Sequence, residues 1–229
     1  MCLISGSNEY QSNISLPGFK QYLETQYSLQ CTLIQARGKL NQFGEYSELP
    51  GLESIDHSDV VILFTRRLTL PEEQLNKIRE TIDSGKPVVA IRTASHGFQG
   101  WPEFDKIVLG GNYHGHFGTE FKQTLISVTA FQNHPVLKGV DKIISTSSLY
   151  KTSPVAADAD VLMISSTHES TQPAAWTRIH HGGRIFYTSL GSPEDFQDPS
   201  FRQLLINAIF WTSGREAGPR CQGESNPQK

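Results

Sequence analysis

The stretch from residue 60 to residue 91 reads VVILFTRRLTLPEEQLNKIRETIDSGKPVVAI. Its two ends, residues 60–64 and 87–91, are short apolar runs rich in valine and isoleucine. Such near-continuous runs are typical of strands that are covered on both faces of a sheet. The segment between them carries apolar residues at helical spacing. Strand, helix and strand in this order predict a parallel sheet of an α/β protein.

The helix predicted inside this stretch runs from Pro71 to Ser84. Proline suits a first helical turn, Thr69 can cap the helix, and Gly85 can end it. Two further helices are predicted, over about residues 17–27 and 199–213. Five more apolar runs predict strands at 2–4, 31–34, 124–128, 161–164 and 184–188.

The order of these elements predicts how the sheet is wound. Its beginning, strand, helix, strand, strand, helix, strand, fits a flavodoxin-like sheet in which the first and third strands are neighbours. Residues 119–155 hold strand-like pieces without a long helix, so we expect them to form an antiparallel extension. We expect a single domain over residues 1–213, followed by a flexible C-terminal tail at 214–229 that is rich in glycine and proline.

The composition of the chain bears on which partners the protein binds and on the cellular compartment in which it is found. The chain has 229 residues, 37% of them hydrophobic, and a formal net charge of -3. These values predict neither nucleic-acid nor membrane binding. The three cysteines form no pairing pattern, which favours a reducing, cytoplasmic location. Whether an export leader has been removed stays open, as does a homo-oligomeric state.

Loops that leave the carboxyl ends of the strands are expected to meet in one crevice. Three of them contribute Arg66, Arg67 and Arg92, which could clamp a carboxylate or a phosphate. The alternative is that one arginine pairs with Glu9 and another is solvated.

The turn after the strand at 87–91 is where α/β hydrolases and amidotransferases place a nucleophile. Arg92 occupies this position, and no cysteine lies near it in sequence. Cysteine-dependent amidotransferase chemistry is therefore excluded. Ser95 and His96 follow on the same turn, but adjacent residues rarely face each other, so a serine mechanism is disfavoured.

A glycine-rich stretch at 108–118, VLGGNYHGHFG, carries His114 and His116. In an extended segment both histidines could face one way and share a metal with His96 and a carboxylate such as Glu9 or Asp195. Spacing fixes no third ligand, so we predict neither a metal nor a cofactor. The glycines are expected to allow close backbone packing beside the crevice.

Several ordered motifs together resemble the ThuA-like, or trehalose utilisation, family over about residues 2–215. These motifs are Gly85-Lys86-Pro87 followed by a strand and His96-Gly97, the element from Leu109 to His116, His134-Pro135 with Gly139, 173–177, 183–191 and 204–211. The resemblance implies a class I glutamine amidotransferase-like, flavodoxin-like three-layer sandwich with a mainly parallel central sheet and an antiparallel extension. It also implies a role in carbohydrate metabolism.

The chain departs from this family's pattern at the site. Many relatives have an Asp-Glu pair where Ser147 and Ser148 stand, and histidines where Arg92 and Ser192 stand. These changes weaken a metal-dependent hydrolase or isomerase function, which stays one alternative. A non-catalytic sugar-binding or partner-supporting module is the other.

The favoured hypothesis is a protein that binds or transforms a sugar or a sugar-derived acid in the crevice. The residues expected to take part in catalysis are His116, His96 and Arg92. Those expected to contact this small carbohydrate are Glu9, Tyr10, Arg66, Arg67, Thr93, His114, Tyr150 and Ser192. Either histidine would act as acid or base, because imidazole titrates near neutral pH.

Overall fold

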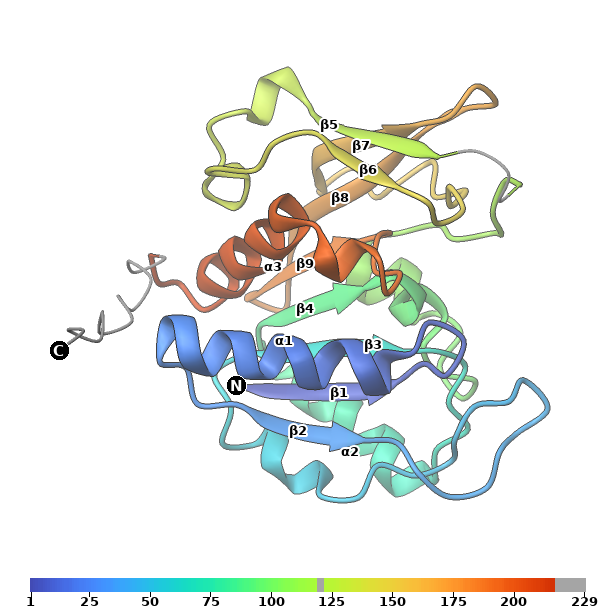
Figure 1. Cartoon of the computed structure of the whole chain (residues 1–229). Coiled ribbons are helices and arrows are strands. Elements are labelled where there is room, and N and C mark those ends of the chain that lie inside the picture. The colour runs from blue at the N-terminus through green and yellow to red at the C-terminus, as the bar shows by residue number, and fades with distance from the viewer. Residues whose placement is uncertain (119–121, 217–229) are drawn as a thin grey trace, which may run out of the picture.

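The computed structural model describes residues 1–118 and 122–216, and these form one nine-stranded sheet in the order β2-β1-β3-β4-β9-β8-β7-β5-β6 (Figure 1). The strands are β1 (Cys2–Gly6), β2 (Thr32–Gln35), β3 (Val61–Thr65), β4 (Val88–Ile91), β5 (Gln123–Ser127), β6 (Ile143–Ser145), β7 (Asp160–Ser166), β8 (Thr171–His180) and β9 (Gly183–Thr188). The longer helices are α1 (Ser12–Tyr27), α2 (Glu72–Asp83) and α3 (Pro199–Thr212).

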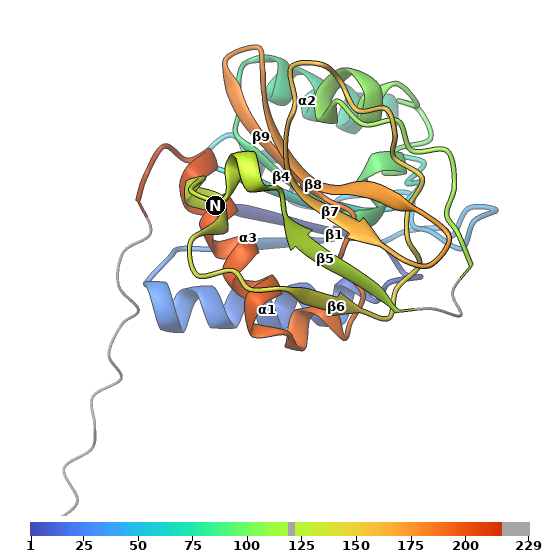
Figure 2. The ribbon, with the colours of Figure 1, turned by 90° about the horizontal axis from the view of Figure 1, so that it is seen from above.

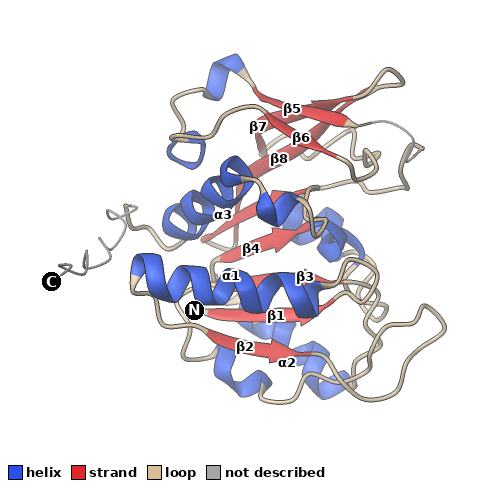
Figure 3. Ribbon diagram, viewed as in Figure 1, coloured by secondary structure: helices blue, strands red, loops and turns tan. Residues whose placement is uncertain are grey.

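The sheet has a parallel half and an antiparallel half (Figure 3). Strands β2, β1, β3, β4 and β9 pair in parallel, and β1 lies beside β3. Strands β8, β7, β5 and β6 continue the sheet with antiparallel pairing. The mainly parallel α/β core and its antiparallel extension are thus confirmed.

Helices cover both faces of the parallel half, with α1 and α3 on one side and α2 on the other (Figure 2). Alternate strand residues feed two cores, because successive side chains point to opposite faces. Leu3 and Ile62 pack in the core that includes Leu16 of α1, whereas Ile4 and Leu63 pack in the core that includes Ile78 of α2. This double covering explains why the strands read as continuous apolar runs.

Two details of the predicted helices are wrong. The first helix begins at Ser12, so Pro17 lies inside it. Thr69 does not cap α2, because Pro71 is the N-cap residue without a side-chain hydrogen bond, and the Thr69 hydroxyl instead accepts one from Asn41. Gly85 does follow the end of α2, with a φ of 87° that suits glycine.

Two strands were missed by sequence reasoning. Strand β8 contains Pro173 and two alanines, which have low strand propensity. Its pairing with β7 is irregular around Met163, where the register shifts. Strand β6 has only three residues. The predicted C-terminal tail lies mainly outside the described residues, and no described helix is long and apolar enough to cross a membrane.

Candidate functional site

The carboxyl ends of β1, β3, β4 and β9 lie side by side, and the loops that leave them touch one another. The hydroxyls of Ser7 and Thr93 lie 3.2 Å apart, and the backbone N–H of Arg67 donates to the carbonyl of His96 over 2.8 Å. Farther along the chain, Tyr113 stacks on His96 with ring centroids 4.4 Å apart. The predicted meeting of the loops is therefore observed.

Arg92 occupies the turn after β4 in a left-handed conformation, with a φ of 46°. Its side chain is fully buried between the rings of Tyr10 and Tyr150, 4.3 and 4.5 Å from their centroids. Four oxygens accept its hydrogen bonds, from Tyr10, Ser147, Ser148 and the carbonyl of Ser189. Arg92 thus ties four loops together and is enclosed by protein.

The charge of Arg92 survives this burial without a carboxylate in contact. Burial acts to lower its pKa, but Tyr150, Tyr10 and Asp195 act in the opposite direction, and the net pKa lies above the ordinary value. The side-chain groups that accept from it, the hydroxyls of Tyr10, Ser147 and Ser148, are uncharged. Arg92 is therefore a buried cation at this turn, and hydrogen bonds to neutral groups such as the two serine hydroxyls stabilise it.

The other two arginines have different partners. Arg66 forms ion pairs with Glu9 and, over 3.3 Å, with the buried Glu45, so the alternative of a Glu9 pair is confirmed. Burial raises the pKa of Glu45. Arg67 lies over the ring of Phe43, 4.6 Å from its centroid. The three arginines are therefore not one clamp.

A pocket of about 370 Å³ lies between the loop after β4 and the glycine-rich stretch. Its polar lining includes Arg67, Ser95, His96, Asp105, Asn112 and Tyr113. A larger cavity of about 720 Å³ near Met1 and His57 gathers no comparable set of interacting side chains. The smaller pocket is therefore the better candidate site.

Inside this pocket Ser95 and His96 do face each other, contrary to expectation. Ser95 Oγ lies 3.1 Å from His96 Nδ1, because both belong to a tight 3-10 turn at 92–96. Burial, and then Arg67, lowers the pKa of His96 to about 3. His96 is accordingly a neutral imidazole at neutral pH.

Asp105 is the pocket residue that sequence reasoning missed. It is 7% exposed, and burial raises its pKa to about 6 although the N–H of Tyr113 donates to Oδ2 over 2.7 Å. Its Oδ1 is buried without a partner among the described residues. A Cβ at Gly111 would lie 2.2 Å from this oxygen, so the carboxylate needs the glycine. In the sequence, Gly111 was a sign of close packing, but nothing there pointed to Asp105 as its neighbour.

The remaining predicted residues lie around the pocket in different environments. His114 and His116 are exposed on an extended segment that pairs with 149–151, and neither lines the pocket. Among the described residues they form no group of three metal-binding side chains. Ser192 is buried, its N–H donates to Asp195, and its hydroxyl has no described partner.

Parallel strands with helices on both faces, and a sharp turn after β4, define an α/β protein, and they are consistent with a glutamine amidotransferase-like fold. A family model described as "ThuA: Trehalose utilisation" matches residues 27–212, and the chain belongs to this family.

Solved structures agree with this fold. A ThuA-like protein from Parabacteroides merdae is 19% identical with a TM-score of 0.69, and the match covers 95% of this chain and 91% of that one. For a ThuA-like protein from Bacteroides uniformis the values are 16%, 0.67, 92% and 89%. A β-galactosidase from Rahnella is 16% identical with a TM-score of 0.58, covering 91% of this chain and 30% of that one. A search of curated proteins gave no match.

Proposed function

We propose that this three-layer, amidotransferase-like framework binds a sugar or a sugar-derived acid in the pocket beside His96 and transforms it by acid–base chemistry. The observation that carries the proposal is one pocket that holds a carboxyl with a pKa of about 6 and a neutral imidazole. A pair of titratable groups displaced in opposite directions is typical of acid–base sites.

The lining suits a carbohydrate. The faces of His96 and Tyr113 offer apolar surface to a sugar ring, while Arg67 and Asn112 offer donors to hydroxyls or to a carboxylate. The family's description, trehalose utilisation, supports a carbohydrate-related role. The β-galactosidase that shares the fold supports it as well.

The proposed roles follow from the environment of each group. Asp105, partly protonated near neutral pH, gives or takes a proton, and His96, which stays neutral, positions the ligand through a hydrogen bond. Arg92 is enclosed, so we now assign it to positioning the loops rather than to contact with the ligand. Residues 92–97, which form this turn, include no cysteine, so no glutaminase activity is expected.

The alternative is a sugar-binding module without catalysis, which would use the same pocket. The metal-dependent alternative has no supporting observation, because the described residues of the crevice do not bring three ligands together. A small carbohydrate partner, no nucleic acid, and a homo-oligomer remain predictions.

The test is calorimetric titration with a panel of mono- and disaccharides, aldonic acids and keto acids, followed by turnover assays on any that bind. Arg67→Ala should weaken binding by about ten-fold or more, since it removes a charge-assisted contact. Asp105→Asn should keep binding and lose turnover by roughly 100-fold or more. His114→Ala is the control, because His114 is exposed and lies outside the pocket.

Two results would count against the proposal. If the wild type and Arg67→Ala bound the same compound with equal affinity, the pocket beside His96 would not be the binding site. Binding without turnover of any compound, in the wild type and in Asp105→Asn alike, would favour the sugar-binding module. His116→Ala tests which residue is the acid or base. If this variant lost turnover, His116 at the rim of the crevice would take that role instead of Asp105.

A further inference from the structure

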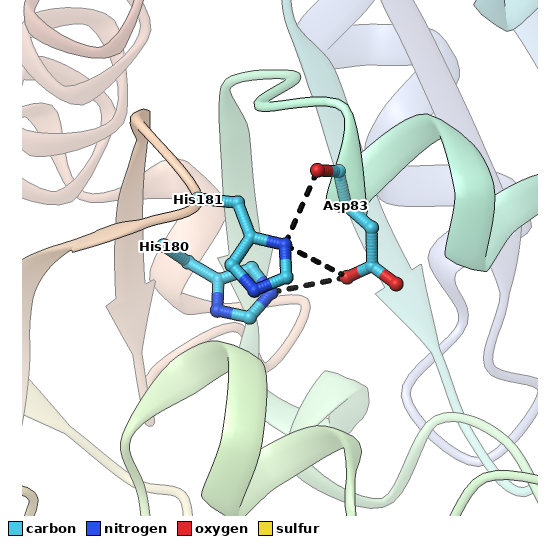
Figure 4. Close-up of side chains that lie close together, drawn as sticks. All are labelled: Asp83, His180 and His181. Atoms are coloured by element: carbon cyan, nitrogen blue, oxygen red, sulfur yellow. Dashed lines mark hydrogen bonds and ion pairs between the residues drawn. The ribbon is translucent and has the colours of Figure 1, made fainter.

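A second cluster of ionisable side chains lies at the opposite end of β4 and β9 from the pocket. Asp83 is the last residue of α2, and His180 and His181 lie where β8 turns into β9 (Figure 4). Asp83 Oδ1 is 3.3 Å from His180 Nε2 and 3.6 Å from His181 Nδ1. One ligand atom from each of the three lies within 4.8 Å of the others, and no other such group occurs within 1–118 and 122–216.

We propose that Asp83, His180 and His181 bind one divalent ion of the Zn²⁺ type. Ligands that surround zinc at about 2.0–2.2 Å in a tetrahedron are roughly 3.3 Å apart, which is close to the 3.3 and 3.6 Å that separate Asp83 Oδ1 from the two imidazole nitrogens. Two imidazoles and a carboxylate form a set that zinc accepts, with a fourth position for water. Asp83 and His181 are exposed, so an ion can reach them from solvent.

The electrostatics of α2 supply an independent reason for a cation at this place. Asp83 puts a carboxylate at the C-terminal end of the helix, where the negative end of the helix dipole disfavours it. The last turn carries no basic residue, and among the described residues the side chains within 4.0 Å of the Asp83 carboxylate that could balance its charge are these two histidines. A bound dication would neutralise both the carboxylate and the helix end.

The protonation state of His180 and the orientation of both histidine rings suit metal binding. Burial lowers the pKa of His180, and His181 and Arg178 act in the same direction, whereas its hydrogen bond to Asp83 opposes the shift. His180 is therefore neutral near pH 7, which is the form that binds metals. The two rings are stacked, with centroids 4.2 Å apart, so both present a nitrogen to Asp83 (Figure 4).

Backbone contacts fix the hairpin against the end of α2. His181 and Gly182 both have positive φ, 47° and 84°, as in a type I′ turn. A Cβ on Gly85 would lie 2.8 Å from the carbonyl oxygen of His181, so these two turns approach closely. An ion at this point would tie α2 to the β8–β9 hairpin and would stabilise the fold without contact with the carbohydrate pocket.

The experiment is calorimetric titration of the untagged full chain with ZnCl2 at pH 7.5, with thermal unfolding in parallel. We expect one Zn²⁺ per chain and a rise in Tm. MgCl2 should give neither effect, because Mg²⁺ prefers oxygen ligands. His181→Asn removes one ligand but keeps a residue that tolerates a positive φ. It should weaken Zn²⁺ binding by at least about ten-fold.

Asp83→Asn should have the same effect, and His57→Ala, which changes an exposed histidine elsewhere, should bind Zn²⁺ as the wild type does. Equal Zn²⁺ affinity in His181→Asn and the wild type would overturn the proposal. So would absence of Zn²⁺ binding in the wild type, which would leave the histidines as hydrogen-bonding caps of α2. Circular dichroism of the ion-free variants verifies that they are folded.

Discussion

Two clusters of ionisable side chains lie at opposite ends of the same strand pair, β4 and β9, and they differ in how far their charged groups are exposed to solvent. At the carboxyl end, Arg92 is enclosed between aromatic rings, His96 is held neutral by burial and Asp105 has a raised pKa. At the amino end, Asp83 and His181 are exposed and only His180 is buried. The first cluster depends on protein atoms for its solvation, and the second is open to water and ions.

The difference teaches that the charged partners of a buried histidine, rather than its burial, set what the ring can do in this fold. His96 and His180 both have lowered pKa values with burial as the leading cause. His96 faces arginines, whereas His180 faces a carboxylate. The same ring therefore serves as a neutral pocket wall at one end and as a candidate ligand at the other. The following changes test this contrast, beginning with the largest expected effect.

Arg92→Ala should destabilise the protein by about 3–5 kcal/mol, because it empties a fully enclosed volume and leaves buried oxygens without donors. The free energy of unfolding from urea denaturation measures this effect. Arg67→Ala is the matched control, since Arg67 is half-buried, and it should cost less than about 1 kcal/mol. Equal losses in the two variants would contradict the assigned difference.

Asp105→Asn should stabilise the protein by on the order of 1–3 kcal/mol at pH 8. The pKa of Asp105 is raised to about 6 from 3.8, so the folded state binds more protons than the unfolded state between these values. Its contribution is therefore favourable below pH 3.8 and is lost as the pH rises through 6. Urea denaturation at pH 4 and pH 8 should show a gain from the neutral amide only at the higher pH. A gain of the same size at both would contradict the raised pKa.

Glu9→Gln should reduce stability by less than about 1 kcal/mol, because its ion pair with Arg66 lies partly in solvent. The small loss should disappear in about 1 M NaCl, where charges are screened over roughly 3 Å. Urea denaturation at low and high salt measures it. Persistence of the loss at high salt would show that Glu9 acts on the buried Glu45 through Arg66 rather than as a surface pair.

Much of the parallel half could be predicted, because both faces of its strands are covered and the apolar runs are uninterrupted. That β1 and β3 are adjacent in the sheet could be predicted from the order of the elements alone. Strand β8 was missed because Pro173 and the alanines have low strand propensity. It forms nevertheless, because it pairs with β7 on one side and β9 on the other. Its stability derives from pairing and from Trp176, which donates to the carbonyl of Leu109 over 2.7 Å.

The site was less predictable because its chemistry depends on burial and on close approach. The meeting of Glu9 with Arg66, and of His96 with the strand-end loops, followed from topology. The enclosure of Arg92 and the contact between Ser95 and His96 depend on φ values and turn geometry that residue types alone do not specify. Asp105 carried no motif, its pKa is raised by burial, and its carboxylate fits only because Gly111, six residues later, has no side chain.

The pairing of β4 with β9 also has a consequence for how the chain acquires its structure. Val88 lies beside Ile185, so two neighbouring strands are separated by 97 residues, the difference between 185 and 88. Closing so long a loop is entropically slow compared with forming the early strand and helix units. During synthesis, the edge of β4 stays open until the last quarter of the chain arrives. We therefore expect β9 and α3 to complete the fold late, and the Asp83 cluster, whose histidines lie at the turn between β8 and β9, to form only then.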